Sequence, residues 1–300
     1  MADPTGRRTL SEHAARAAIR GGTGTGGRHA SPPLLIPDGL EASIVLLRHG
    51  ESTAIVDGLF QGQLDTPLSP TGRRQAELAA RRLARPHASP SLPLPSGAPI
   101  EIAHSPLRRT TETAAAVAAA ASGSDAFARP IPVRADSGFL EVGQGEWEGR
   151  PATEIEERWA DILHAWWDRP TEVHAPGGES LAEVAARVRP SLAALLSGLA
   201  AAGPREASGS RVLGAGDDAS DNPWSIVVGH DGVFKVVLLT LFDLPLERFW
   251  LFSFALCGIA IVDLSYGRPR LRAHNLTEHL APLEERAQEV SEAREESGAL

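Results

Sequence analysis

Short apolar runs recur along the chain from residue 43 onward, and polar or alanine-rich segments separate them. Each run has the length of a strand that is buried on both faces of a sheet. The sequence predicts strands at residues 44–47, 100–103 and 225–228, a short edge strand at 131–133 and a final strand at 258–264. These runs together predict a buried central sheet.

Helices are predicted between these strands. Ser69 followed by Pro70 is a typical helix start, an N-cap with proline at the first helical position, and predicts a helix to about Ala84. The alanine-rich residues 107–121 have high helix propensity. Further helices are predicted at residues 151–168, 180–200 and 232–242. Strands that alternate with helices indicate an α/β fold, a three-layer α/β/α sandwich with a mostly parallel central sheet.

The composition divides the chain into three regions. Residues 1–40 are rich in glycine and end in a proline-rich stretch, which predicts a disordered N-terminal tail. The glycine run at 21–27 has no strand before it and no Gly-Lys-Ser/Thr after it, so it does not predict a nucleotide-binding loop. Residues 41–283 are predicted to form one domain and residues 284–300 a charged tail. Within the domain, the composition of residues 86–99 and 203–223 predicts loops.

Composition and charge narrow the classes of function. The net charge of -9 has the wrong sign for a protein that binds nucleic acid or an anionic membrane. No apolar run approaches the ~18 residues that a membrane span needs, and Cys257 is the only cysteine, in apolar surroundings that predict an inert core thiol. A cytoplasmic protein is therefore expected, in which local arginines would gather any anionic ligand.

Unusual polar residues follow three of the predicted strands. The three segments are Arg48-His49-Gly50-Glu51-Ser52, His104-Ser105-Pro106-Leu107-Arg108-Arg109 and Gly229-His230-Asp231-Gly232. Ligands bind beyond the carboxyl ends of parallel strands, so we expect these segments to meet at one edge of the sheet. Gly50 would let the main chain approach a bound group closely.

Two arginines and two histidines in these segments suit phosphoryl transfer. The guanidinium fork fits phosphate oxygens, so Arg48 and Arg109 are predicted to neutralise the charge of the transferred group. An imidazole nitrogen can attack phosphorus, which makes His49 the predicted nucleophile, with His230 donating to the phosphoryl group. A metal site built from His49, His104 and His230 is the competing hypothesis, but the adjacent arginines would repel a divalent cation.

With these motifs the chain resembles the histidine phosphatase superfamily over roughly residues 43–281. The resemblance is to the branch that contains broad-specificity phosphatases, and it implies the phosphoglycerate-mutase-like fold. The family's Arg-His-Gly matches the segment at His49, and its Ser-Pro-Leu-x-Arg matches with Arg109, rather than Arg108, as the phosphate-binding arginine. The second histidine falls on His230 and the catalytic acid on Glu141. The resemblance implies a phosphohistidine intermediate, with neither a metal nor an organic cofactor.

Further matches concern the loop after the nucleophile and the start of a later helix. Residues 61–68 resemble the loop, and residues 176–180 resemble the segment that opens the helix. The substrate-binding residues implied are Arg48, Ser52, Gln61, Gly62, Arg109 and His230. Family members commonly carry Trp-Asn after the signature, whereas this chain has Ala54-Ile55, which leaves the fit of the substrate open.

Glu141 has a chemical role in this interpretation and two local rivals. It would protonate the leaving alkoxide and then activate the water that releases phosphate from the nucleophile. Glu146 and Glu148 are the rival carboxylates, and a structural role for Glu141 is the alternative. For His104 a structural role is favoured over a contact with the substrate. For the tryptophans at 159, 166 and 167 core packing is favoured, with a substrate wall as the second interpretation.

A phosphatase of small phosphomonoesters is the predicted function, with a small phosphorylated metabolite as its ligand. A phosphoglycerate mutase, an isomerase, is the alternative. In mutases of this family a sequence similar to Arg-His-Tyr-Gly typically follows the catalytic acid, whereas Val142-Gly143 follows Glu141 in this chain. A binding module with a decayed site is the third hypothesis, and the retention of all five catalytic residues argues against it. The sequence leaves the oligomeric state open, a dimer included.

Overall fold

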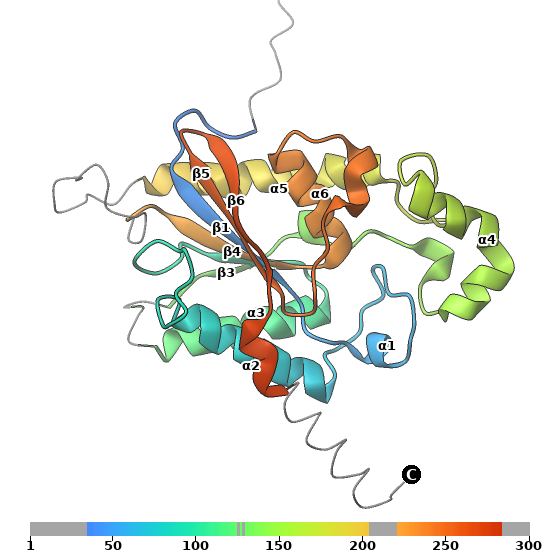
Figure 1. The fold of residues 1–300 in the computed structure, drawn as a ribbon, viewed down its shortest axis with the longest axis horizontal. Coiled ribbons are helices and arrows are strands. Elements are labelled where there is room, and N and C mark those ends of the chain that lie inside the picture. Colours follow the sequence, from blue (N-terminus) through green and yellow to red (C-terminus); the bar gives the residue numbers. More distant parts are fainter. Residues whose placement is uncertain (1–34, 125–126, 128–129, 204–220, 284–300) are drawn as a thin grey trace, which may run out of the picture. The chain divides into compact units, whose positions relative to one another are not determined.

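The computed structural model describes residues 35–124, 127, 130–203 and 221–283 (Figure 1). The predicted N-terminal tail at 1–40 falls almost wholly outside these residues, and the predicted charged tail at 284–300 falls wholly outside them. Both therefore stay predictions, as does most of the predicted loop at 203–223.

Within the described residues, six strands form one mixed sheet in the order β3-β2-β4-β1-β5-β6. The strands are β1 (Ala42–Arg48), β2 (Ile102–His104), β3 (Val133–Ala135), β4 (Trp224–Gly229), β5 (Ile259–Ser265) and β6 (Arg268–Leu276). The first four strands run parallel, whereas β5 is antiparallel to β1 and β6 is antiparallel to β5. The prediction of a mostly parallel α/β sheet is confirmed.

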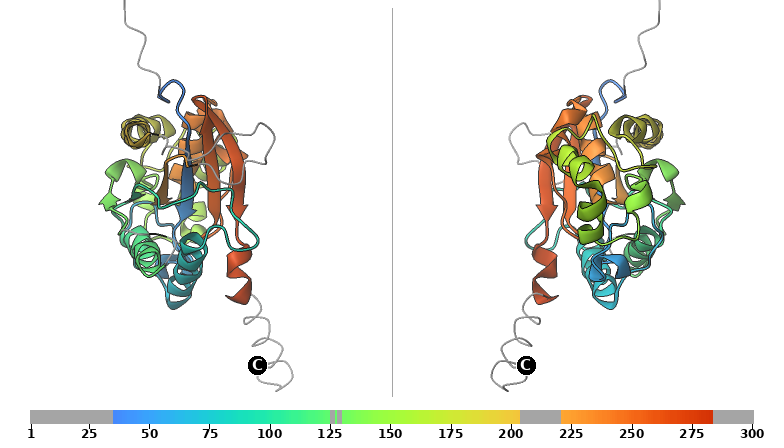
Figure 2. Two further views of the ribbon diagram at one scale, coloured as in Figure 1. Left: turned by 90° about the vertical axis from the view of Figure 1, so that its left-hand side faces the viewer. Right: turned by 90° about the vertical axis from the view of Figure 1, so that its right-hand side faces the viewer.

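Helices cover both faces of the sheet (Figures 1 and 2). The helices are α1 (Thr53–Val56), α2 (Pro70–Ala84), α3 (Arg108–Ser122), α4 (Ala152–Asp168), α5 (Leu181–Ala202) and α6 (Asp231–Leu241). Short 3-10 segments lie at Ser137–Phe139, Gly145–Trp147, Leu246–Leu251 and Glu278–Leu280. α5 and α6 contribute to the core on one face and α2 and α3 to the core on the other. The three predicted layers are present.

The alternation of side chains along β1 explains why one strand supports two cores. Ile44 and Leu46 belong to the core under α5 and α6, and Val45 and Leu47 belong to the core under α2 and α3. All four side chains are fully buried, which contributes about 1.5–3 kcal/mol each to folding. The main chain at the end of β1 is therefore held firmly from both sides.

α5 combines a strong start with a buried apolar stripe. Ser180 and Glu183 form a capping box at its N-terminus. α5 is the one helix in the described part of the chain that is long and apolar enough to cross a membrane. Its buried residues recur at helical spacing and belong to the core; they are Leu181, Val184, Val188, Leu192, Leu195, Leu196 and Leu199. We therefore interpret α5 as a core helix.

Two strand predictions were wrong in detail. β5 is not the final strand, because β6 follows it. The segment of β6 is largely polar and contains Pro269, a pattern that does not signal a buried strand but suits an edge strand. The predicted edge strand at 131–133 is also shifted, because β3 pairs with β2 only from Val133 onward. Residues 86–99 form a loop as predicted, although Leu92 and Leu94 are buried against the core.

Candidate active site

The register of β1 and β4 brings the two predicted catalytic histidines together. Arg48 pairs with Gly229, so His49 and His230 follow neighbouring strand ends. The N–H of His49 donates to the carbonyl of Gly229 at 3.0 Å, and the two imidazole rings lie edge to face with centroids 5.0 Å apart. Both side chains are buried. The predicted convergence at one edge of the sheet is confirmed for these two segments.

A single contact defines the reactive nitrogen of His49. Its Nδ1 lies 2.6 Å from the carbonyl oxygen of Gly50. A carbonyl only accepts, so Nδ1 carries the proton and the neutral ring presents its lone pair at Nε2. Cys257 donates its main-chain N–H to the carbonyl of His49 at 3.2 Å, which fixes the residue from its other side. The geometry makes Nε2 the nucleophilic atom.

Arg109 and Ser105 hold His230 between them. The Nε of Arg109 donates to Nδ1 of His230 at 3.2 Å, so the neutral ring carries its proton on Nε2. That nitrogen lies 2.9 Å from the hydroxyl of Ser105. Arg109 also donates to the carbonyls of Gly62 and Leu64 at 2.8 Å each. Three of its five N–H groups are engaged, which leaves two for a ligand.

Arg48 approaches the site from the end of β1. Its Nη1 donates to the main-chain carbonyl of Phe254, on the segment between the 3-10 turn and β5. Its Nε is buried and has no hydrogen-bond partner within the described part of the chain. A buried donor of this kind next to His49 suits an anionic group. Arg48, His49, Arg109 and His230 are called the phosphate centre below.

The side chain of Glu141 contacts the N-terminus of α6, the helix that directly follows His230. Its Oε1 accepts from the N–H groups of Val142 and Val233 at 2.8 Å each, and its Oε2 accepts from Gly232 at 3.1 Å. The carboxyl group of Glu141 thus lies at the first turn of the helix whose N-cap is His230. Residues 138–143 are called the acid segment.

The other predicted substrate contacts lie in the loop beside Arg109. Ser52 is buried, caps α1 through its side chain and donates to Oε1 of Gln61 at 2.7 Å. Gly62, with a φ of 49°, offers its carbonyl to Arg109. Nothing in these contacts tests a role in substrate binding for Ser52, Gln61 or Gly62, which stays a prediction.

The rival carboxylates have other positions. Oε1 of Glu148 accepts from the main-chain N–H groups of Gln63 at 2.8 Å and Gln144 at 2.9 Å, so this residue holds two loops together. Glu146 is exposed. Neither contacts α6 as Glu141 does, and this difference supports Glu141 over both rivals.

Burial and positive charge govern the ionisation of the centre. Burial lowers the pKa of His49 well below its ordinary 6.5, and the charges of Arg109 and Arg48 lower it further. The pKa of His230 is lowered well below 6.5 for the same reasons. Burial also lowers the pKa of Arg109 to about 10, so this guanidinium keeps its charge at neutral pH. The centre therefore holds two neutral imidazoles next to fixed positive charge.

Gly50 must be a glycine because α2 packs directly against it, which the sequence did not indicate. A Cβ on Gly50 would lie 2.4 Å from the carbonyl oxygen of Gly72 at the start of α2, and one on Gly72 would lie 1.9 Å from the carbonyl of Glu51. The glycine pair lets α2 pack directly on the signature segment. Gly50 is thus required by a neighbouring helix in the protein itself.

Comparison with known proteins agrees with this geometry. A sequence profile of the histidine phosphatase superfamily (branch 1) matches residues 44–202 and 205–277. The chain belongs to this family.

Relatives and solved structures extend this result. Phosphoserine phosphatase 1 of Hydrogenobacter thermophilus is 27% identical over 79% of this chain and 93% of its own. Glucosyl-3-phosphoglycerate phosphatase of Mycobacterium tuberculosis is 32% identical over 68% of this chain and 77% of its own. A structure of the mycobacterial glucosyl-3-phosphoglycerate phosphatase with VO3 has a TM-score of 0.60 at 28% identity and covers 78% of this chain and 99% of that one. A phosphoglycerate mutase is also among the relatives.

These relatives confirm the family and the phosphatase class predicted from the sequence, and they give the mutase alternative less support.

Predictions for individual residues had mixed outcomes. His104 is buried and its Nδ1 contacts the carbonyl of Ser105 at 2.7 Å, but His49 makes the same kind of contact, so the structural role of His104 stays a prediction. Trp166 is buried in the core, but Trp167 is 58% exposed and stacks on Trp250, so core packing is wrong for Trp167. The inert interpretation of Cys257 agrees with its full burial, which raises the pKa of its thiol to about 12.

Some residues of the site gave no usable signal in the sequence. Ser105 belongs to the segment that matches Ser-Pro-Leu-x-Arg, but the sequence predicts no role for it, although its hydroxyl contacts His230. Phe254 and Cys257 act through main-chain atoms, which residue type does not reveal. The side chain of Arg187 on α5, which contacts the main chain of the acid segment, is a further example.

Proposed function

We propose that this phosphatase acts on small phosphomonoesters through a phosphohistidine on His49. The observation that carries the proposal is the contact between Nδ1 of His49 and the carbonyl of Gly50, which leaves Nε2 with a free lone pair. This nitrogen lies in a buried site that also holds His230 and two arginines. Such a site supplies both a nucleophile and charge neutralisation for phosphoryl transfer.

In the first step, Nε2 of His49 would attack phosphorus as the bond to the ester oxygen breaks. Arg48 and Arg109 would neutralise the equatorial oxygens with the N–H groups that the protein leaves open, and the Nε2–H of His230 would turn from Ser105 to a phosphoryl oxygen. Glu141 would give its proton to the leaving alkoxide. The products of this step are the alcohol and phosphohistidine.

In the second step, the Glu141 carboxylate would take a proton from water as the water oxygen attacks phosphorus. The bond to Nε2 breaks, inorganic phosphate leaves, and the neutral imidazole and the carboxylic acid are restored. The same carboxyl group thus serves as acid and then as base, so the cycle closes without a further proton donor.

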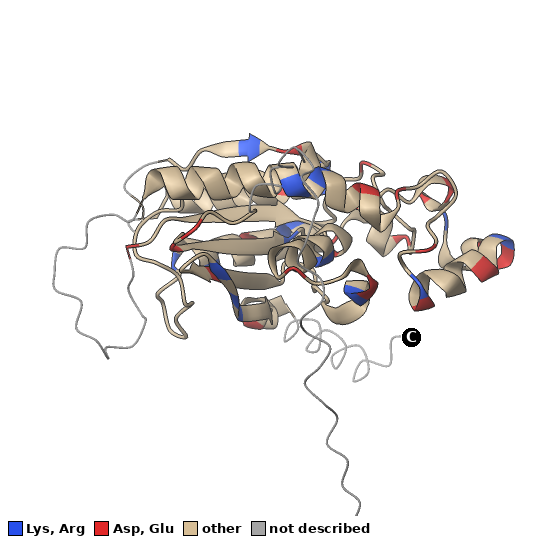
Figure 3. Cartoon of the chain, turned by 90° about the horizontal axis from the view of Figure 1, so that it is seen from above, with Lys and Arg blue, Asp and Glu red and all other residues tan. Residues whose placement is uncertain are grey.

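Ser52, Gln61 and Gly62 are proposed as substrate contacts, because Arg109 anchors the loop that carries two of them. The ligand is proposed to be a small phosphorylated metabolite. Over the described residues, basic positions are interspersed with acidic ones (Figure 3), which favours a compact ligand over a nucleic acid or a membrane surface. A cytoplasmic location is proposed from the amino-acid composition of the chain. A screen of phosphorylated metabolites would identify the substrate.

The test of the nucleophile is His49→Ala, with His104→Ala as a matched control. Both histidines are buried, His49 directly after β1 and His104 as the last residue of β2, but His104 lies outside the phosphate centre. We expect His49→Ala to abolish both hydrolysis of an aryl phosphate and acid-labile labelling by a radioactive phosphate ester. His104→Ala should retain both. Substantial labelling of folded His49→Ala would place the covalent intermediate on another residue.

The mutase alternative has its own test. Interconversion of 2- and 3-phosphoglycerate in the presence of the bisphosphate primer, at a rate above that of phosphate release, would favour it over hydrolysis.

A further inference from the structure

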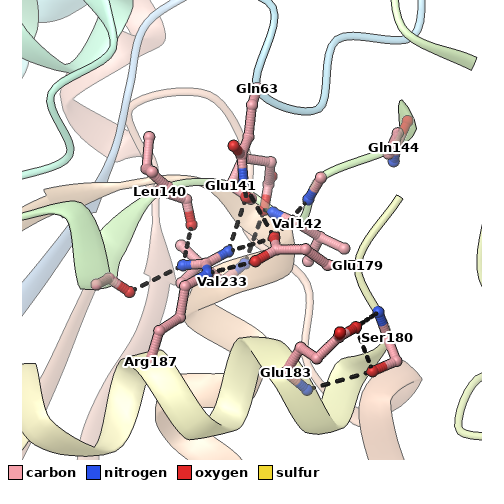
Figure 4. A network of polar contacts seen from close by, with 12 residues as sticks. Gln63, Leu140, Glu141, Val142, Gln144, Glu179, Ser180, Glu183, Arg187 and Val233 are labelled. Atoms are coloured by element: carbon pink, nitrogen blue, oxygen red, sulfur yellow. Dashed lines mark hydrogen bonds and ion pairs between the residues drawn. The ribbon is translucent and has the colours of Figure 1, made fainter. Parts of the chain in front are cut away.

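Arg187 on α5 makes an unusually complete set of contacts beneath the acid segment (Figure 4). Its Nε and Nη2 donate to the two carboxylate oxygens of Glu179 at 2.8 Å each, a bidentate ion pair. The two side chains are only 20% and 25% exposed, so water screens the pair weakly. Arginine is suited to this geometry because its planar fork matches a carboxylate.

The same guanidinium holds the main chain of the acid segment. Nη1 donates to the carbonyls of Gly138 at 3.0 Å and Leu140 at 2.9 Å, and Nη2 donates to the carbonyl of Glu141 at 2.9 Å. Together with the two bonds to Glu179, these contacts use all five N–H donors of Arg187. One side chain on α5 therefore fixes three carbonyls over four residues.

Glu179 and Gln63 complete the arrangement on the other side of Glu141. Oε2 of Glu179 accepts from the N–H of Gly143 at 2.8 Å and from Nε2 of Gln63 at 3.0 Å. Nε2 of Gln63 also donates to the carbonyl of Glu141 at 3.0 Å. The main chain is thus held before, at and after Glu141, and the loop that contacts Arg109 is tied to it.

This support matters because the only regular structure in the acid segment is the end of a short 3-10 turn at residues 137–139. Neither a strand nor an α-helix fixes the direction in which the Glu141 side chain leaves the main chain. A misplacement of about 1 Å in a reacting group can cost on the order of 100-fold in rate. Contacts at the carbonyl of Glu141 itself are the means by which a distant side chain can prevent that displacement.

We propose that Arg187 and Glu179 are positioning residues that hold Glu141 where it can transfer a proton to the leaving group. This inference depends on the proposed function, because it assigns a purpose to contacts that act through the proposed acid. It predicts a loss confined to proton transfer, with phosphate binding and attack by His49 left intact.

The test compares Arg187→Met and Arg187→Lys on phosphate esters with good and poor leaving groups. We expect Arg187→Met to lower kcat on the order of 30-fold for an alkyl phosphate and less than about threefold for p-nitrophenyl phosphate, whose leaving group needs little protonation. Lysine keeps the charge but lacks the fork, so Arg187→Lys should recover only part of the loss. Affinity for inorganic phosphate should stay unchanged in both variants.

A matched control lies at the start of the same helix. Glu183 accepts from the main-chain N–H of Ser180 in the capping box and makes no contact with the acid segment (Figure 4). Glu183→Gln should lower the melting temperature of the protein without changing the dependence of kcat on the leaving group. This control separates a loss of helix stability from a loss of positioning.

The decisive measurement places Arg187→Met in a Glu141→Gln background. If Arg187 acts through Glu141, the added substitution should cause no further leaving-group-dependent loss, because the acid is already absent. An additional loss of the same size as in the wild-type background would overturn the proposal, as would equal losses for both esters. If Arg187→Met does not fold, Arg187→Lys and Glu179→Gln replace it in the same cycle. Absence of turnover in the wild-type protein would instead contradict the proposed function.

Discussion

The two parts of the site are held by different kinds of structure. The two histidines of the phosphate centre follow the ends of β1 and β4, where main-chain pairing and two buried cores fix them. The acid segment has little regular structure and depends on the side chains of Gln63, Glu179 and Arg187. The pairing of strands fixes the position of a residue without any side-chain contact. A loop needs side-chain donors and acceptors to hold its main chain. Changes in the two parts should therefore have different kinetic signatures.

The largest effect is expected in the phosphate centre, for Arg109→Met. The substitution removes positive charge from the phosphoryl group, the contact to His230 and the anchor of the loop at Gly62. A loss of kcat/KM on the order of 1000-fold is expected, and it should be similar for good and poor leaving groups. The measurement is hydrolysis of a series of aryl and alkyl phosphates.

Arg108→Met is the matched control for this prediction. The side chain of Arg108 is 58% exposed and lies 3.8 Å from Glu112, an ion pair that contributes little to stability. Near wild-type activity is expected. A loss as large as that of Arg109→Met would mean that the phosphate-binding arginine was misassigned.

The next effect belongs to the acid segment, for Glu141→Gln. The amide cannot donate the proton that an alkoxide needs, so kcat for alkyl phosphates should fall about 100-fold and kcat for p-nitrophenyl phosphate much less. Glu146→Gln is the control, because Glu146 is an exposed carboxylate in the same region. Equal losses for all leaving groups in Glu141→Gln would count against its role as the acid.

The contrast between these parts also explains what the sequence could reveal. The phosphate centre was predictable because apolar runs mark strands and polar residues that follow them converge. β6 was missed because an edge strand with exposed polar residues has no such run. Arg187 was missed because a charged residue on an amphipathic helix usually faces water. Its partners include carbonyls up to 49 positions away, which depend on a main-chain path that no local pattern encodes.

A smaller effect within the phosphate centre is expected for Ser105→Ala. The alanine removes the acceptor for Nε2 of His230 but leaves the contact of Arg109 with Nδ1. A loss of about tenfold in kcat is expected, because the ring keeps one of its two partners. Ser225→Ala is the control: Ser225 is equally buried, on β4, and its hydroxyl has no partner in the described part of the chain. Equal losses in both variants would show that the effect reflects packing.

The smallest effect concerns the pH dependence of stability. The phosphate centre and the acid segment should change the free energy of unfolding over different pH ranges. Burial, with the charges of Arg109 and Arg48, lowers the pKa of His49 and His230 in the folded protein. The unfolded chain therefore binds more protons below about pH 6.5, and the free energy of unfolding should fall as the pH drops below that value, by at most about 1.4 kcal/mol per pH unit for each histidine. Burial acts to raise the pKa of Glu179, but Arg187 and the N–H of Gly143 lower it more.

The net lowering of the pKa of Glu179 means that the stability it contributes is present above about pH 4.5 and is lost as the pH falls further. Urea unfolding of Glu179→Gln should therefore show a flatter pH dependence below pH 4.5 and no change between 5 and 6.5. His230→Gln should flatten the pH dependence from about pH 6.5 downward, although His274 and His279, whose pKa values burial also lowers, keep part of that slope. The range between about pH 5 and 6.5 therefore separates the two variants. If Glu179→Gln also flattened the slope in that range, the phosphate centre and the acid segment would form one electrostatic unit, and the distinction between them would fail.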